Sequence, residues 1–318
     1  WNNMTQYLLA AIPLFIFMAS MLEKSGVIEE VFDVAYKWLG RIPGGLAVAT
    51  VVASTVLAAM VGVIGAAVVT MALVALPSML RRGYSPVLAV GTVMAGGTLG
   101  ILIPPSVLAI VYGLVANQSV GELYLGSVFP GLVLSGLYIL FSVGYALLNP
   151  KAAPRLSPEE TPTWSERWRA LRSIWSPLVL IFLVLGTIFL GIATPTEGGA
   201  MGAVGSLLLA GLKGRLNLTV IRQALESTTR LSAFVMFILI GARVFSLSFY
   251  GVNGHVWVEH LLVGLPGGAT GFLIFVSLLV FLLAFFLDFF ELAFIIVPLL
   301  GPVADKLGID LIWFGILL

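Results

Sequence analysis

Apolar runs of about 20 residues recur along the whole chain, and a run of that length is what a helix needs to cross a lipid bilayer. Hydrophobic residues make up 60% of the sequence and charged residues only 10%, which is more apolar surface than a soluble core can bury. The strands of an outer-membrane barrel would instead alternate in character over about ten residues. We therefore predict an all-α, polytopic membrane protein.

The same composition excludes several functions. The formal net charge is +1 and no basic stripe is present, so we do not expect a nucleic-acid partner. The sequence contains no cysteine, which excludes disulfides, thiolate metal sites and cysteine nucleophiles. It also has no metalloprotease, Walker or catalytic-triad pattern, and His255 and His260 are typical of a solvated loop. We expect neither enzyme activity nor a cofactor.

The membrane spans can be placed to within a few residues. They are 6–22, 44–62, 63–80, 86–116 with a break, 127–148, 176–193, 198–212, 231–249, 270–287, 289–304 and 311 onward. Segment 23–41 alternates acidic and basic residues and has apolar residues at helical spacing. It fits an amphipathic helix in the membrane interface and an ordinary connecting helix equally well.

A polar stretch rich in proline and charge, 149–173, divides the apolar chain. We predict a first repeat over 1–148, a cytoplasmic linker over 149–175 and a second repeat over 176–318. The sequence begins without a methionine or a signal peptide and stops within an apolar run. We therefore expect a fragment that lacks both ends.

Basic residues gather in three loops, at 81–82, within 149–173 and within 213–230. The positive-inside rule places these loops in the cytoplasm. The loops 117–126 and 250–269 contain neither lysine nor arginine, so we expect them on the outside. Spans 6–22 and 231–249 therefore run in opposite directions.

Two short patterns occur twice. The sequence RIPGG at 41–45 returns as GLPGG at 264–268, and 76–86 returns at an offset of 225 residues that aligns Pro77 with Pro302. Because the loop charges give the two halves opposite orientations, we predict repeats of inverted topology, as in many secondary transporters. Chance similarity between apolar segments is the alternative.

The stretch GGTLGILIPPS at 96–106 interrupts one of the most apolar parts of the chain. Pro104 and Pro105 each remove a backbone donor and the glycines loosen a helix, so we predict that this stretch is not regular helix. Polar backbone groups freed at membrane depth must be buried in protein or must face a polar cavity. Freed carbonyls suit Na⁺, and helix N-termini suit a carboxylate.

Small residues interrupt the apolar run 44–80 near its middle, at Gly62, Gly65 and Ala66. We predict a re-entrant hairpin with its tip at 62–66, which would bring its irregular backbone close to the Pro-Pro break. The alternative is that these small residues serve helix packing.

In the second half the corresponding tip is FFLDFFELAF at 285–294, which holds Asp288 and Glu291. A carboxylate in such a sequence costs about 2.5–3.5 kcal/mol on insertion scales, so a cation or a functional partner is expected. We predict that Asp288 lies nearer the ion and that Glu291 orients it. The alternative is an interfacial residue near a hairpin end.

Two further charges lie next to or within apolar spans. In ATPTEGGAMG at 193–202, we expect Thr196 to cap the helix from 198 onward and Glu197 to lie in its first turn, with substrate contact as the alternative. Arg243 would neutralise a carboxylate or meet an anionic substrate. We assign both charges structural or gating roles.

Four stretches together resemble the large membrane subunit of tripartite ATP-independent periplasmic (TRAP) transporters, the DctM-type permease. They are GVIGAAVVTMALVALPSMLRRGYSP (62–86), GGTLGILIPPSVLAIVYGLVANQSVGELYLGSVFPGL (96–132), TPTEGGAMGA (194–203) and FFLDFFELAFIIVPLLGPVADKLGIDLIWFGILL (285–318). The resemblance implies an elevator-type transporter in the cytoplasmic membrane of a bacterium or archaeon. It also implies Na⁺-driven uptake of an organic acid, an extracytoplasmic solute-binding protein that delivers the acid, and a small membrane subunit, separate or fused.

The resemblance further implies one sodium site where the hairpin tip meets the broken segment. Its residues would be Gly62, Gly65, Ala66, Gly97, Thr98, Pro104, Pro105 and Ser106, mainly through carbonyl oxygens and the Thr98 hydroxyl. A second site would pair the 288–291 hairpin with a second Pro-Pro loop beyond Leu318, so we do not expect this chain to transport alone. The Na⁺ ligands singled out are Gly62, Gly65, Thr98 and Asp288. Many relatives carry a hydroxyl residue at the tip, where this chain has alanines.

Two other interpretations differ in testable ways. A stand-alone carrier of carboxylates or arsenite would need no binding protein, so an adjacent gene for a secreted binding protein would argue against it. A structural membrane subunit would have its broken segments filled by side chains and would have no polar cavity. The amino-acid sequences of both hairpin tips resemble those of the TRAP transporters that take keto acids or aromatic acids.

The predicted topology can be tested with cysteines placed in the full-length protein. A cysteine at Ser157 should be labelled from the cytoplasmic side and one at Asn253 from outside, because only the first lies in a basic loop. A membrane-impermeant maleimide applied to vesicles of both orientations measures this. Labelling of both positions from one side would contradict the inverted repeats.

Overall fold

The computed structural model describes residues 7–62, 64–155 and 162–318, so the labelling position Ser157 lies outside it. No strand occurs among the described residues, which confirms the predicted all-α class. The elements are η1 (Tyr7–Ala10), α1 (Ala11–Lys24), α2 (Val27–Leu39), α3 (Gly45–Val61), α4 (Ile64–Arg81), α5 (Pro86–Leu102), α6 (Val107–Ala116), α7 (Val120–Leu148), α8 (Trp164–Ser173), α9 (Trp175–Phe189), α10 (Pro195–Leu212), α11 (Leu218–Gly251), α12 (Gly254–Val263), α13 (Gly268–Leu283), α14 (Phe289–Glu291), the π-helix η3 (Leu292–Ile296), α15 (Val297–Lys306) and α16 (Leu311–Leu317).

In the described part of the chain, three continuous helical segments are long and apolar enough to cross a membrane: η1–α1, α7 and α11. Three bent pairs also qualify, namely α5 with α6 at 41°, α8 with α9 at 44°, and α12 with α13 at 118°. Helices α3 and α4 have 17 and 18 residues. At about 1.5 Å per residue each is shorter than the roughly 30 Å hydrocarbon core, as expected of the two arms of a re-entrant hairpin.

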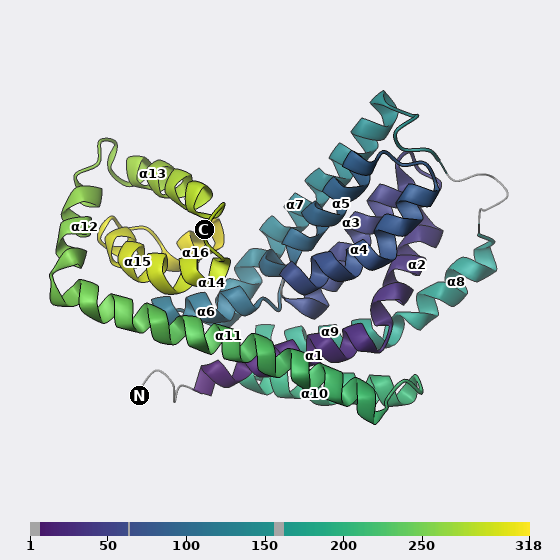
Figure 1. Cartoon of the computed structure of the whole chain (residues 1–318), viewed down its shortest axis with the longest axis horizontal. Coiled ribbons are helices and arrows are strands. Elements are labelled where there is room, and N and C mark those ends of the chain that lie inside the picture. The colour runs from purple at the N-terminus through teal and green to yellow at the C-terminus, as the bar shows by residue number, and fades with distance from the viewer. Residues whose placement is uncertain (1–6, 63, 156–161) are drawn as a thin grey trace.

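Two lobes stand on a layer formed by α1, α9, α10 and α11 (Figure 1). One lobe contains α2 to α5 and α7, and the other contains α12 to α16, with α6 between them. Helices α8 and α12 mark opposite ends of the long axis. The described part of the basic linker and the outer loop without lysine or arginine before Gly268 therefore lie far apart along this axis, and their placement on opposite sides of a membrane stays a prediction.

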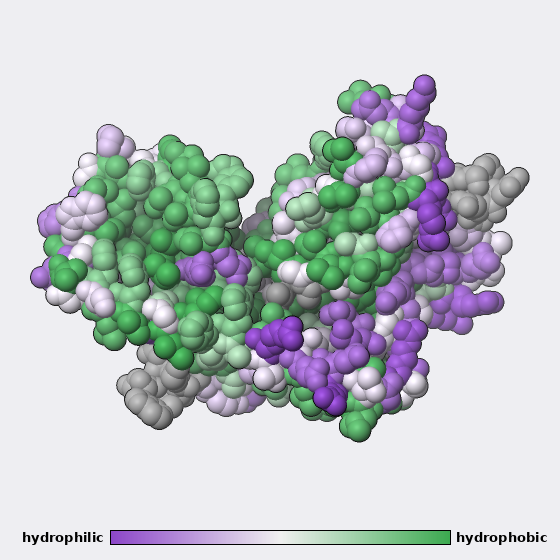
Figure 2. Space-filling view, in the orientation of Figure 1, coloured by the Kyte–Doolittle hydropathy of each residue, from purple (hydrophilic) through white to green (hydrophobic). Residues whose placement is uncertain are grey.

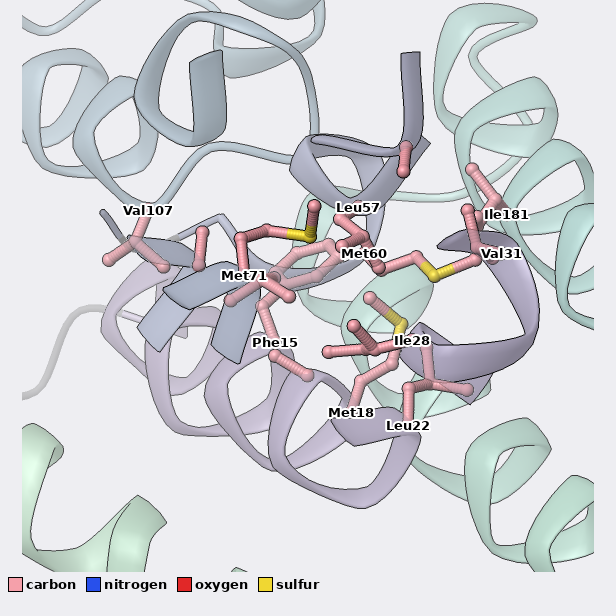
Figure 3. Close-up of a cluster of buried hydrophobic side chains, with 14 of the residues drawn as sticks. Phe15, Met18, Leu22, Ile28, Val31, Leu57, Met60, Met71, Val107 and Ile181 are labelled. Carbon is pink, nitrogen blue, oxygen red and sulfur yellow. The ribbon is translucent and has the colours of Figure 1, made fainter. Parts of the chain in front are cut away.

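The largest apolar cluster joins the first lobe to the layer of long helices. Figure 3 shows its centre, where Phe15 and Met18 of α1 lie beside Met60 of α3 and Met71 of α4. These methionines are at most 1% exposed, and their unbranched side chains fill irregular gaps between crossing helices. A separate cluster holds α12, α13, α15 and α16 together through Leu262, Phe272, Val303 and Phe314. The second lobe therefore has a core of its own, whereas the first lobe shares its core with the layer of long helices and with Phe290 and Phe294 of the second tip.

Helix boundaries in the two lobes repeat at the offset found in the sequence. Helix α4 ends at Arg81 and α15 ends at Lys306, an offset of 225 residues. Each helix is followed by a glycine in the left-handed region, Gly83 with φ +77° and Gly308 with φ +72°. Because such a glycine ends a helix at the αL position, the same capping device closes both hairpins.

Some segments predicted as loops contain helices. The linker includes α8, and the outer loop 250–269 includes α12. Helix α8 is polar, so it has no apolar run that would reveal it, and it begins with a capping box between Thr163 and Glu166. Segment 23–41 forms α2, whose apolar face is buried mainly against α3 and α8, so the connecting-helix interpretation describes it better.

The loop between α10 and α11 contacts the corner between α1 and α2 through a hydrogen bond and an ion pair. Arg215, in the α10–α11 loop, donates from Nη1 to the Ser25 carbonyl at 3.0 Å, and Lys213 pairs with Glu30. Gly26 has φ +70°, and a Cβ added there would lie 1.5 Å from Arg215 Nη1. A larger residue at position 26 would displace the guanidinium from this corner.

This contact predicts a difference between two glycine variants. Gly26 and Gly214 both have positive φ, +70° and +66°, but a Cβ at Gly214 would meet nothing within 4 Å. The left-handed backbone alone costs a non-glycine residue about 1–2 kcal/mol, and Gly26→Ala must also displace Arg215. Gly26→Ala should therefore melt at a lower temperature than Gly214→Ala in detergent-purified protein. Equal melting temperatures would mean that Arg215 does not constrain the corner.

Candidate functional site

The tip of the first hairpin meets the break between α5 and α6. Gly62 ends α3 with φ +59°, and its carbonyl accepts a hydrogen bond from the Val107 amide at 3.4 Å. A Cβ added at Gly62 would lie 2.4 Å from the Pro105 carbonyl oxygen. The two irregular backbones are therefore in direct contact, as the small residues at the tip predicted. Gly65 and Ala66 lie beyond the tip, in the first turn of α4.

The break is shorter than predicted. Helix α5 is regular as far as Leu102, so the expectation that all of 96–106 departs from helix was wrong. The glycines serve close packing instead: a Cβ at Gly96 would lie 2.5 Å from Ser54 Oγ, and one at Gly97 would lie 2.1 Å from a methyl carbon of Val68. They let α5 approach both arms of the hairpin.

The break itself is buried in protein. Ile103, Pro104, Pro105 and Ser106 are each buried, and the Pro104–Pro105 peptide bond is cis. The Tyr124 hydroxyl donates to the Ser106 carbonyl at 3.2 Å. The Ser106 hydroxyl caps α6 by accepting from the Ala109 amide at 3.4 Å. Protein groups thus satisfy backbone groups on the α6 side of the break, in agreement with the need for partners at membrane depth.

The second tip is closed by its two carboxylates. Asp288 is the N-cap of α14 and accepts from the Phe289 amide at 2.8 Å. Glu291 accepts from the backbone amide of Asp288 at 3.2 Å, which completes a capping box. The spacing of three residues between Asp288 and Glu291 is the spacing of this motif. Glu291 thus holds the backbone of Asp288, while the predicted role of Asp288 toward an ion stays a prediction.

A cavity of about 500 Å³ lies between the two lobes, and the space-filling view shows the surface hollowed there (Figure 2). Its wall is mostly aliphatic. Four described lining residues have polar side chains: Thr98 from α5, Tyr112 from α6, Ser127 from α7, and Asp288 from the second tip. The cavity therefore brings together groups from both halves of the chain.

The structure separates the predicted site residues into two groups. Thr98 and Asp288 line the cavity. The described lining does not include Gly62, Gly65, Gly97, Pro104, Pro105, Ser106 or Glu291. The Thr98 hydroxyl donates to the Ala95 carbonyl at 2.7 Å within the helix and lies 3.3 Å from Tyr138 Oη. Thr98 therefore reaches the cavity from regular helix and does not belong to the break.

The two charges assigned structural or gating roles lie outside the cavity lining described here. Glu197 forms a capping box with Thr194, so Thr194 is the N-cap of α10 and the expectation that Thr196 caps this helix was wrong. Proline is well suited to the first helical position, so α10 begins at Pro195 and not at the predicted residue 198. The Thr196 hydroxyl instead donates to the Tyr7 carbonyl at 3.2 Å. Arg243 is exposed on α11.

Sequence reasoning missed Tyr112 and Ser127. The Tyr112 hydroxyl donates to the Leu311 carbonyl at 2.5 Å, and a Cβ at Gly315 would lie 2.3 Å from the tyrosine ring. A single tyrosine in the otherwise apolar helix α6 was an available signal, because a buried phenol needs a partner. The matching glycine is in α16, more than 200 residues away, so the pairing was not visible in the sequence.

A mostly apolar cavity with a few polar groups, set between two halves that each carry a hairpin, is typical of a membrane transporter. The family model described as the DctM component of tripartite ATP-independent periplasmic transporters matches residues 1–318. The chain therefore belongs to the DctM family of TRAP transporter large permeases.

Individual relatives agree with this assignment. The chain is 33% identical to the C4-dicarboxylate TRAP transporter large permease protein DctM of Vibrio cholerae, over 98% of this chain and 72% of that protein. It is 34% identical to the protein of the same name from Pseudomonas aeruginosa, with the same coverage. It is 30% identical to the ectoine/5-hydroxyectoine TRAP transporter large permease protein UehC of Ruegeria pomeroyi, over 96% of this chain and 71% of that protein.

The contact between tip and break predicts that two neighbouring glycines differ in importance. Gly62→Ala would strain a left-handed residue and push a methyl group into the Pro105 carbonyl, whereas a Cβ at Gly65 meets nothing within 4 Å. In the full-length transporter, Gly62→Ala should reduce the uptake rate about tenfold, which corresponds to an increase of about 1.4 kcal/mol in the activation free energy of transport. Gly65→Ala should keep nearly the parental rate. Equal uptake by both variants would contradict a functional contact at Gly62.

Proposed function

We propose that this chain is the permease subunit of a Na⁺-coupled secondary transporter that imports an organic acid. The observation that supports it best is the shared cavity, into which the first half contributes Thr98 and the tip of the second hairpin contributes Asp288. Hydroxyl, carboxylate and carbonyl oxygens are the ligands of hard cations. The described residues contain no group of three or more histidine and acidic side chains that could hold a metal, so backbone oxygens would complete the set.

The mechanism follows from the charge at the second tip. A carboxylate beside an apolar cavity is costly unless a cation neutralises it, so Na⁺ binding next to Asp288 would lower the cost of moving this tip through the membrane. The separate apolar core of α12, α13, α15 and α16 supports an elevator movement, in which the second lobe shifts against the layer of α1, α9, α10 and α11. The organic acid would travel in the cavity between the lobes.

The partners follow from the family description, which contains the words tripartite and periplasmic. A solute-binding protein outside the cytoplasmic membrane would deliver the organic acid, and a small membrane subunit would extend the layer of long helices. Family membership favours this assembly over a stand-alone carboxylate or arsenite carrier. The cavity argues against a purely structural subunit, although the break itself is packed with side chains, as that alternative expected.

Charge and shape at the second tip can be separated by two conservative variants. Asp288→Asn keeps an N-cap residue and removes the charge, so it should abolish Na⁺-dependent uptake and leave membrane insertion intact. Glu291→Gln keeps the capping box and should have a milder effect. Uptake by the full transporter in proteoliposomes, with and without a Na⁺ gradient, measures both. Normal uptake by Asp288→Asn together with loss in Glu291→Gln would reverse the two roles.

Thr98 tests the contribution of the first half. Thr98→Val keeps the volume and removes the hydroxyl oxygen, so it should raise the Na⁺ concentration needed for half-maximal uptake. Ser142→Ala on α7 is a matched control, because its hydroxyl bonds only the Tyr138 carbonyl in its own helix and Ser142 is not among the described cavity-lining residues. An unchanged Na⁺ dependence in Thr98→Val would make Thr98 a packing residue.

A further inference from the structure

Helix α8 of the linker is fixed to α2 by an aromatic cluster. The ring centroid of Trp38 lies 5.6 Å from that of Trp164 and 5.9 Å from that of Trp168. The Trp38 indole donates to the Arg167 carbonyl at 3.3 Å. Yet Trp164 and Trp168 remain 62% and 48% exposed, so the cluster presents a wide aromatic surface outward.

The same helix exposes positive charge. Arg169 and Arg172 are exposed on α8. Glu166, the one acidic residue of this helix, is engaged in the capping box, where hydrogen bonds from Thr163 hold the pKa of its carboxyl below its usual range. Its negative charge is thus located at the helix N-terminus, and the later turns of α8 are basic.

The position of α8 matches that of a helix at a membrane surface. It lies with α2 at the end of the long axis where hydrophilic side chains gather (Figures 1 and 2). It bends by 44° into the apolar helix α9, which begins with Trp175, 68% exposed. Tryptophan at the headgroup level with arginine just outside it is the arrangement expected of an interfacial segment facing anionic lipid.

We propose that α8 binds anionic phospholipid headgroups of the cytoplasmic leaflet. The exposed faces of Trp164 and Trp168 lie at the headgroup level, and Arg169 and Arg172 hold lipid phosphates through their planar guanidinium groups. Bound lipid then keeps the linker against α2 and fixes where the second half enters the membrane. This inference does not depend on the coupling ion or on the transported acid.

The test uses the full-length permease with its small subunit, titrated with phosphatidylglycerol or with phosphatidylcholine of the same acyl chains. Native mass spectrometry reports the lipid retained. The parental complex should retain phosphatidylglycerol more tightly, and Arg169→Gln/Arg172→Gln should weaken that affinity by roughly fivefold for each arginine removed. Arg169→Lys/Arg172→Lys should keep most of it. The control Arg222→Gln/Arg230→Gln removes two exposed arginines from α11 and should change little.

Three outcomes would overturn the proposal. Equal retention of the two lipids would show that headgroup charge is not recognised. An equal loss in the α11 control would show a diffuse electrostatic effect instead of a surface on α8. If the isolated permease retained phosphatidylglycerol and the complex did not, the small subunit would occupy this surface.

Discussion

The structure depends on one constraint: backbone polar groups at membrane depth need partners, because lipid offers none. The first hairpin and the broken helix satisfy this constraint together. The Gly62 carbonyl accepts a hydrogen bond from the Val107 amide, and the Tyr124 hydroxyl donates one to the Ser106 carbonyl. The glycines of α5 make this possible because they let the helix lie against both arms of the hairpin. Tip, break and close packing are therefore one unit, and a change in one of them affects the others.

The second hairpin meets the same constraint in a different way. Its tip is closed by the side chains of Asp288 and Glu291, which accept hydrogen bonds from backbone amides. The first tip rests on neutral backbone, whereas the second carries two carboxylates, of which Asp288 lines the cavity. The two halves therefore share helix boundaries and capping glycines but differ in charge where they face each other. This asymmetry is the basis for the proposal that the coupling cation binds at the second tip.

The sequence predicted the features that depend on local chemistry. Apolar runs indicated the helical class, and the repeated Pro and Gly positions indicated matching helix ends, because a glycine in the left-handed region ends a helix wherever it occurs. The sequence failed where distant packing decides. Gly96 and Gly97 looked like helix breakers, yet α5 continues through them because Ser54 and Val68 of the hairpin arms pack closely against them.

The contents of the cavity were harder to predict for the same reason. Thr98 and Asp288 stood out as polar residues in apolar sequence, and both line the cavity. Tyr112 was overlooked, since its partners Leu311 and Gly315 belong to α16.

The N-cap of α10 was misplaced by two residues: Thr194 and Thr196 both lie at the start of α10, and only Thr194 forms the capping box with Glu197.

The contact between Arg215 and the corner after α1 has a consequence for biosynthesis. Helix α1 packs mainly against α10 and α11, and the Ser25 carbonyl waits for a guanidinium that lies 190 residues later in the chain. At typical ribosomal speeds that interval is roughly ten to forty seconds. During this time α1 must remain in the bilayer without its final neighbours. Its almost wholly apolar sequence allows this, so α1 is inserted into the membrane well before the helices that hold it in place.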